Sequence, residues 1–168
     1  MNTKARHLAY AAILAALYAV LTHLQNLMFP GSATWMIQLR LSEALMILCF
    51  FTPAAPMGLA VGCLIFNITF APALPLDFLV GTLATYFAGK CMWLTREKKL
   101  LGLPVLGLCM PALWNAVLVG WELSVYIGGG FLLNAFYVAL GEAIVLLVFG
   151  TALYALMKNR GLNKRLFN

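Results

Sequence analysis

Four acidic side chains and three amides, all in or beside hydrophobic segments, are the residues of this sequence best suited to chemistry. The chain has only five acidic residues, and Glu97 lies in a charged hinge. The remaining acids and the amides are Glu43, Asp77, Glu122, Glu142, Asn67, Asn115 and Asn134. A charged side chain near the centre of a bilayer costs about 3 kcal/mol on insertion scales, so such residues need a function. Their oxygens accept hydrogen bonds and together suit a cationic ligand that is rich in N–H donors.

Helical phase places several of these residues together. Asn115 and Glu122 are seven positions apart, so at about 100° per residue they share one face of a helix. Trp114 and Trp121 form an adjacent pair with the same spacing. The sequence therefore predicts one wall that contains an amide, a carboxylate and two indole rings.

The other polar residues fit this arrangement to different degrees. Asn134 and Glu142 project within about a quarter turn of each other. Asn67 lies opposite the face of its segment that contains Gly58 and Gly62, so an inward and an outward orientation both stay open. Asp77 lies at the end of a stripe of small residues that permits close helix packing, Gly81, Ala84 and Ala88.

Each of these residues also has a structural explanation. The two tryptophans could lie in the aromatic belt at the membrane interface. Glu122 and Asp77 could be solvated charges at the ends of helices. Glu43 could form an ion pair with Arg40, three residues earlier, and Glu142 could have a structural role.

The composition of the chain sets its fold class. Of 168 residues, 64% are hydrophobic and 10% are charged, whereas ordinary globular chains are roughly half apolar and about a quarter charged. A helix needs about 20 mostly apolar residues to cross the hydrocarbon layer. We predict a single all-α transmembrane domain over residues 1–168, a six-helix bundle with segments near 8–28, 39–51, 57–70, 77–94, 101–121 and 131–157. The second and third segments are short, and a re-entrant pair is the alternative.

The distribution of basic residues predicts the orientation of this bundle. With six crossings, both termini and the loops after the second and fourth segments share one side of the membrane. Of the eleven basic residues, all except Arg40 lie on or near that side. By the positive-inside rule, the N- and C-termini are cytoplasmic. This topology accounts for the net charge of +6, so we predict contact with membrane lipid and none with nucleic acid.

Several classes of function have no residues to support them. The sequence contains no HExxH, GxSxG or Walker A motif, and its four cysteines lie in apolar runs without CxxC spacing. We predict no catalytic residue, no metal and no cofactor, and hence a binding or carrier protein. The first apolar run reaches Met28 without a convincing cleavage site, so we expect a retained helix rather than a signal peptide.

The chain resembles the QueT family of queuosine-precursor transporters along nearly its whole length. The stretches that carry the resemblance are residues 38–45, 50–59, 62–67, 76–85, 114–123 and 137–142. The resemblance implies a substrate-binding S component of an energy-coupling factor (ECF) transporter in the bacterial plasma membrane. The implied partners are a transmembrane coupling subunit and two ATPase subunits. A stripe on the first segment resembles the small-residue motif by which S components contact the coupling subunit, namely Ala9, Ala12, Ala16 and Ala19.

The implied ligand is a 7-deazaguanine, such as 7-aminomethyl-7-deazaguanine or queuine. Its guanine-like edge would donate two hydrogen bonds to one carboxylate, and an aminomethyl cation would need a second carboxylate. The candidates for both carboxylate roles are Glu43, Asp77, Glu122 and Glu142, with Arg40 beside Glu43. The three asparagines are candidates for amide contacts with the ligand, and Trp114, Trp121 and Tyr126 are candidates for stacking on it. We expect the loop from Phe29 to Ile37 to cover the ligand as a lid.

Two other functions stay open at this point. An S component with another vitamin-like ligand would differ only in its ligand-contacting side chains. A small intramembrane enzyme would show turnover without any partner protein.

Overall fold

The computed structural model describes residues 3–32, 37–70, 73–100 and 102–167. Over these residues the protein is all-α, and none of them forms a β-strand. The proposed lid falls in part on residues 33–36, which lie outside the described residues. The helices are α1 (Thr3–Met28), η1 (Leu41–Phe50), α2 (Ala55–Thr69), α3 (Asp77–Thr95), α4 (Val105–Leu108), α5 (Met110–Tyr126), α6 (Phe131–Val145), η2 (Leu146–Gly150), α7 (Thr151–Asn159) and α8 (Leu162–Phe167).

Each hydrophobic segment is helical, but the helices are divided differently from a simple six-helix bundle. The second segment, η1, is a 3₁₀ helix rather than an α-helix. Pro111 lies in the first turn of α5, where its missing N–H is tolerated, and α5 is thereby separated from the short α4. The last segment is one long rod in which the π-helical η2 joins α6 to α7. The short α8, which the sequence did not predict, follows it.

Three described helical stretches are long and apolar enough to cross a membrane, namely Thr3–Met28, Val105–Tyr126 and Phe131–Asn159. Leu41–Phe50 and Ala55–Thr69 are shorter apolar helices. The structure therefore agrees with a multi-pass membrane protein. Six crossings with cytoplasmic termini stay a prediction.

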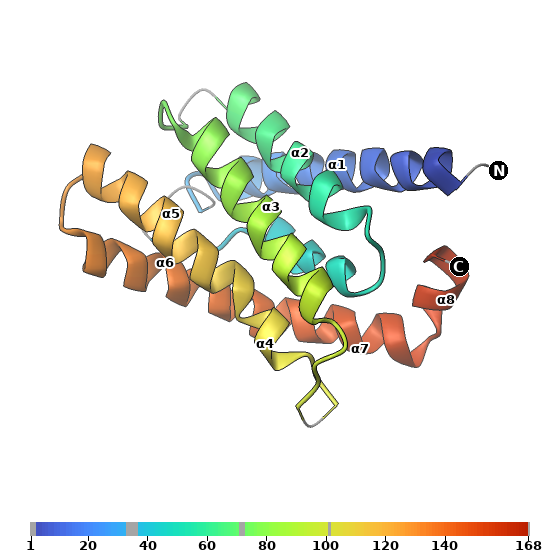
Figure 1. Ribbon diagram of the computed structural model, residues 1–168. Helices are drawn as coiled ribbons and strands as arrows, with labels where there is room; N and C mark the ends of the chain where they lie inside the picture. The colour runs from blue at the N-terminus through green and yellow to red at the C-terminus, as the bar shows by residue number, and fades with distance from the viewer. Residues whose placement is uncertain (1–2, 33–36, 71–72, 101, 168) are drawn as a thin grey trace.

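The helices pack in a curved row, in the order α1, α2, α3, α5 and α6 (Figure 1). The short η1 contacts α1, α2, α3, α6, η2 and α7, so it fills the space between the two ends of the row. Both chain termini lie at one end of the molecule, whereas the α5–α6 connection lies at the other end (Figure 1). We call these the terminal end and the opposite end.

Small residues let α1 and α2 touch through their backbones. A Cβ atom added at Gly58 would lie 2.6 Å from the carbonyl oxygen of Ala11, and one at Gly62 would lie 2.7 Å from that of Ala15. Contacts this close are typical of helix packing within a membrane, where small residues take the place of a hydrophobic driving force. Ala11 and Ala15 therefore face α2.

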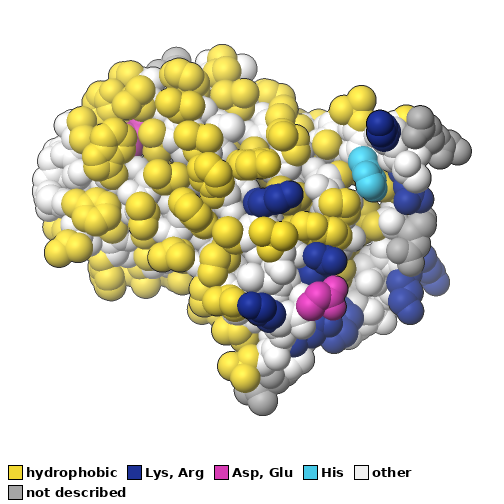
Figure 2. Space-filling model, viewed as in Figure 1, with side chains coloured by type: hydrophobic (Ala, Val, Ile, Leu, Met, Phe, Trp, Pro, Cys, Tyr) yellow, Lys and Arg dark blue, Asp and Glu magenta, His cyan; other side chains and the backbone are white. Residues whose placement is uncertain are grey.

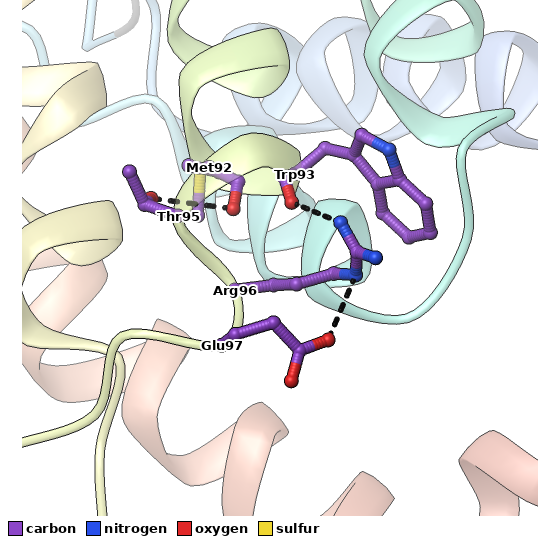
Figure 3. Close-up of polar contacts among 5 residues, drawn as sticks. All are labelled: Met92, Trp93, Thr95, Arg96 and Glu97. Carbon is purple, nitrogen blue, oxygen red and sulfur yellow. Dashed lines mark hydrogen bonds and ion pairs between the residues drawn. The ribbon is translucent and has the colours of Figure 1, made fainter.

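The surface is apolar over much of its area and basic near the termini. Figure 2 shows hydrophobic side chains over most of the visible face, with lysine and arginine gathered in the half that contains both termini. In this basic half, at the end of α3, Arg96 lies over the ring of Trp93 and donates a 2.8 Å hydrogen bond to its carbonyl oxygen (Figure 3). Arg96 Nε is also 3.4 Å from Glu97 Oε1. This surface is the one that a membrane protein with a positively charged cytoplasmic side would have.

Candidate functional site

Polar and charged side chains are buried inside this apolar bundle, and most of the predicted site residues are among them. Glu43, Glu122, Asn134 and Glu142 are at most 3% exposed, and Arg40, Asn67 and Asn115 are also buried. An unpaired polar group in such surroundings costs free energy, so the hydrogen-bond partners of each residue reveal whether its role is structural. Their contacts divide the residues into two groups.

The first group surrounds Glu43, in the first turn of η1. The hydroxyl of Tyr18, which is fully buried on α1, donates a hydrogen bond to Glu43 Oε1. One turn further along α1, Thr22 donates to the hydroxyl of Ser42 at 2.6 Å. The two bonds fix the start of η1 against α1. They also hold the carboxylate of Glu43 in the interior.

Arg40 supplies the positive charge of this group. Its Nη1 lies 3.6 Å from Cys63 Sγ on α2, and its guanidinium lies 5.5 Å from the centre of the Phe66 ring. It is close enough to Glu43 and Glu142 to attract both carboxylates. The guanidinium is therefore shared between acids from two different helices.

Gly141 explains why Glu142 can join this group. A Cβ atom at Gly141 would lie 2.5 Å from the carbonyl oxygen of Gln38, so the backbone before η1 lies directly on α6. This contact brings Arg40 towards the next residue of α6, Glu142. Asn115 on α5 donates a 3.1 Å hydrogen bond to Glu142 Oε1. Asn115 and Glu142, two of the candidate site residues, are thus in direct contact.

Gln25 holds the same backbone segment from the other side. Its amide nitrogen donates to Ser32 Oγ and to the carbonyl oxygen of Leu39, and its amide oxygen accepts a 2.7 Å hydrogen bond from the backbone N–H of Leu41. The segment that enters η1 is therefore attached to α1 through Gln25 and packed on α6 through Gly141.

The second group lies around Glu122. The Glu122 side chain is fully buried, and neither of its carboxylate oxygens has a hydrogen-bond partner among the described residues. It lies near Asp77, whose negative charge opposes its own. Asp77 is half-buried, and its Oδ2 accepts a 2.7 Å hydrogen bond from the backbone N–H of Leu74. Asp77 therefore has a local hydrogen-bonding partner in the backbone, whereas the carboxylate of Glu122 lies near that of Asp77 without a partner for either oxygen in the described residues.

Two further asparagines are buried, Asn67 beside Asp77 and Asn134 beside the connection between α5 and α6. Asn67 is buried and donates a 2.7 Å hydrogen bond to the carbonyl oxygen of Asp77, so it faces α3 and is not directed outward. Asn134 is fully buried and donates a 2.7 Å hydrogen bond to the carbonyl oxygen of Gly128. In both amides the nitrogen is satisfied, while the oxygen has no partner in the described part of the chain.

The aromatic residues proposed for stacking lie elsewhere. Trp121 is 49% exposed and Tyr126 is 42% exposed, so both side chains face outward. Trp114 is half-buried and packs against Phe87 of α3, with ring centres 5.0 Å apart. The exposure of Trp121 fits the interface-belt explanation, whereas the stacking roles of Trp114 and Tyr126 stay predictions.

Some residues of the first group were not predicted from the sequence. Tyr18 and Thr22, four residues apart on α1, form a polar stripe whose spacing could have been recognised in the sequence. Ser42 beside Glu43 is a weaker signal. Cys63 was interpreted as a packing residue, but its sulfur lies 3.6 Å from both Arg40 Nη1 and Asn67 Nδ2.

The interior as a whole has too many acceptors. In the described ranges, the deeply buried residues leave only oxygen atoms without a partner, namely Glu43 Oε2, Glu142 Oε2, both oxygens of Glu122, and Oδ1 of Asn26, Asn67 and Asn134. The buried charge of Arg40 does not balance the three carboxylates of Glu43, Glu122 and Glu142, and these acceptor oxygens lack donors among the described residues. Such an interior can bind a guest that supplies both donors and positive charge. No group of three or more His, Cys, Asp or Glu residues that could hold a metal occurs in the described part of the chain.

The family model described as QueT transporter matches residues 8–159. No curated protein and no solved structure matches the chain.

Proposed function

The chain belongs to the QueT transporter family, and from this premise we propose that it is the substrate-binding S component of an ECF transporter. In this role it captures a 7-deazaguanine precursor of queuosine at the outer face of the bacterial plasma membrane for ATP-driven uptake. The observation that supports the proposal most strongly is the excess of buried acceptor oxygens without a partner among the described residues. A 7-deazaguanine with an aminomethyl group supplies the missing donors and the missing positive charge.

The two groups of side chains suggest which part of such a ligand each group would bind. We assign the guanine-like edge to Glu122, because both of its buried oxygens lack a partner in the described structure and an edge with two adjacent N–H donors can satisfy both. We assign the aminomethyl cation to Glu43 and Glu142, each of which has one such oxygen. Arg40 attracts both carboxylates, yet Glu43 Oε2 and Glu142 Oε2 have no hydrogen-bond partner among the described residues.

Calorimetry on the purified chain tests this function. We expect 7-aminomethyl-7-deazaguanine to bind most tightly. Guanine, which lacks the cation, should bind more weakly. A 7-deazaadenine, which lacks the paired N–H edge, should not bind measurably. Tighter binding of thiamine or riboflavin would instead identify an S component for a vitamin, and conversion of the ligand by the isolated chain would identify an enzyme.

The partner proposal rests on the exposed face of α1. Ala5, Ala9, Ala12 and Ala16 are exposed on this helix, whereas Ala19, which belongs to the same stripe, is only 7% exposed. The exposed part of the stripe therefore ends at Ala16. A smooth face of this kind permits close approach by another membrane helix, and we propose that it contacts the coupling subunit, which in turn binds two ATPase subunits.

A bulky substitution tests this docking face. We expect Ala12→Trp to prevent co-purification with the coupling subunit and to reduce uptake into cells at least tenfold, because the indole holds the two helix backbones apart. Binding of 7-aminomethyl-7-deazaguanine by the isolated chain should not change. The control is Leu132→Trp on α6, at a position that is 80% exposed and distant from α1 in the sequence. Normal uptake by Ala12→Trp would show that α1 does not contact the coupling subunit through this face.

A further inference from the structure

A groove near the terminal end belongs to neither group of the site. It has a volume of about 280 Å³ and lies between α1, η1, α7 and α8. Its lining includes Tyr10, Ile13, Leu45, Leu153, Leu166 and Phe167. The rings of Tyr10 and Phe167 meet edge to face, with centres 5.4 Å apart, where α8 crosses α1. The lining is almost wholly apolar, so the groove suits a hydrocarbon chain.

Basic residues adjoin the lining residues of this groove on α1 and α8. Arg6 lies one helical turn before Tyr10 and therefore on the same side of α1. Lys164 and Arg165 directly precede the lining residue Leu166 in α8, and both are exposed. The Nε atom of Arg6 is buried and has no hydrogen-bond partner among the described residues, so an acceptor is missing there.

From this combination we propose that the groove is a binding site for an anionic phospholipid from the leaflet at the terminal end. One acyl chain lies in the groove, and the phosphate group accepts a hydrogen bond from Arg6 Nε between the charges of α1 and α8. Basic pockets between membrane helices bind anionic head groups by the same chemistry.

Selectivity must come from the head group. An acyl chain that enters the groove leaves surroundings as apolar as the groove itself, so its transfer provides little preference for any lipid. The basic residues favour a net negative head group over a zwitterionic one. Each such residue near the surface contributes about 1 kcal/mol, which corresponds to about fivefold in relative affinity.

This site is separate from the proposed docking face. On α1, Ile13 and Tyr10 line the groove, whereas Ala9, Ala12 and Ala16 are centred about 100° away around the helix. Lipid binding and contact with a partner helix can therefore occur together. The lipid site does not depend on the identity of the transported ligand.

Native mass spectrometry of the purified chain tests the proposal. The protein is titrated with phosphatidylglycerol and phosphatidylcholine that have the same acyl chains, and the ratio of the two retained lipids is measured. We expect preferential retention of one phosphatidylglycerol. Arg6→Gln should lower the ratio about fivefold, and Lys164→Gln serves as a second charge variant. Ile13→Trp, at a lining position that is 57% exposed, should fill the groove and remove the retained lipid.

Two matched controls separate this site from general attraction to a basic surface. Lys90→Gln removes an exposed charge from α3, and Leu8→Trp adds an indole to α1 at a position that is 72% exposed and does not line the groove. Both should retain phosphatidylglycerol as the unaltered chain does. Equal retention of the two lipids by the unaltered chain would overturn the proposal. So would a ratio that falls as far in Lys90→Gln as in the charge variants, or normal retention by Ile13→Trp.

Discussion

Glu122→Gln is expected to weaken binding of 7-aminomethyl-7-deazaguanine at least about 100-fold without destabilising the unliganded protein. Hydrogen bonds to charged groups contribute about 1.5–3 kcal/mol each, and the substitution removes the charge from two of them and replaces one acceptor by a donor. In the unliganded protein, neither oxygen of Glu122 bonds to any described residue. A neutral amide costs less to bury than an unpaired carboxylate, so the temperature of unfolding should stay the same or rise. Calorimetry and thermal unfolding in detergent measure the two quantities.

The control for this prediction is Glu97→Gln, because the Glu97 side chain is 81% exposed in the hinge after α3. It should change neither affinity nor unfolding temperature. Wild-type affinity in Glu122→Gln would remove Glu122 from the site. A loss of affinity together with a lower unfolding temperature would show that Glu122 has a structural role instead.

Arg40→Gln is expected to lower the stability of the unliganded protein by about 3–5 kcal/mol. The substitution leaves Glu43 and Glu142 buried without the guanidinium that attracts both of them. Removal of one partner from a buried set of charges has a cost of this size, since the remaining charge keeps its desolvation penalty. Thermal unfolding in detergent, followed by circular dichroism, measures the change.

A double variant tests the reason for this loss. If the cost comes from the uncompensated carboxylate, then Arg40→Gln combined with Glu43→Gln should be more stable than Arg40→Gln alone. Arg96→Gln is the control, because Arg96 lies in the hinge with its side chain 33% exposed. Simple addition of the two single effects would show that Arg40 stabilises the fold through its contacts with Cys63 and Phe66 instead.

Periodicity in the sequence was enough to locate the helical segments and to place Asn115 and Glu122 on the same face of one of them. Asn115 and Glu122 are both buried on α5, as their spacing of seven residues predicts. Periodicity could not decide whether the adjacent pair, Trp114 and Trp121, would face the interior or the surface. Phase gives the angle between two side chains on a helix, whereas the direction of the interior depends on the neighbouring helices. Trp121 is consequently exposed although Glu122, the next residue, is fully buried.

Asn67 shows why an isolated helix gives an incomplete prediction. Its segment has a glycine face and an opposite face with the amide, and the sequence left open whether the amide points inward. In the structure both faces are covered, because α2 lies between α1 on the glycine side and α3 on the amide side. The position of α2 between α1 and α3 is a tertiary property that hydrophobic periodicity does not encode.

The charged residues at the start of η1 were identified from their charge and not from periodicity. Glu43 was selected because charges in apolar segments are costly, and Arg40 was selected as its neighbour three residues earlier; both are buried. Their partners Tyr18 and Cys63 were not selected, because residues of these types are common in apolar cores and cost little there. The free-energy cost of burying a charge thus identifies charged side chains in the interior from the sequence, but it does not identify the neutral side chains that contact them.

The backbone from Gln38 to Leu41 lies between α1 and α6 and contacts both helices. It is fastened to α1 by the Gln25 amide and rests on α6 at Gly141 without an intervening side chain. If α1 and α6 are to move apart on this side, either the Gln25 hydrogen bonds or the backbone contact between Gly141 and Gln38 must therefore break first. We therefore expect that, for a ligand entering on this side, substitutions at Gln25 would change the rates of entry and exit more than the affinity of the proposed carboxylate site.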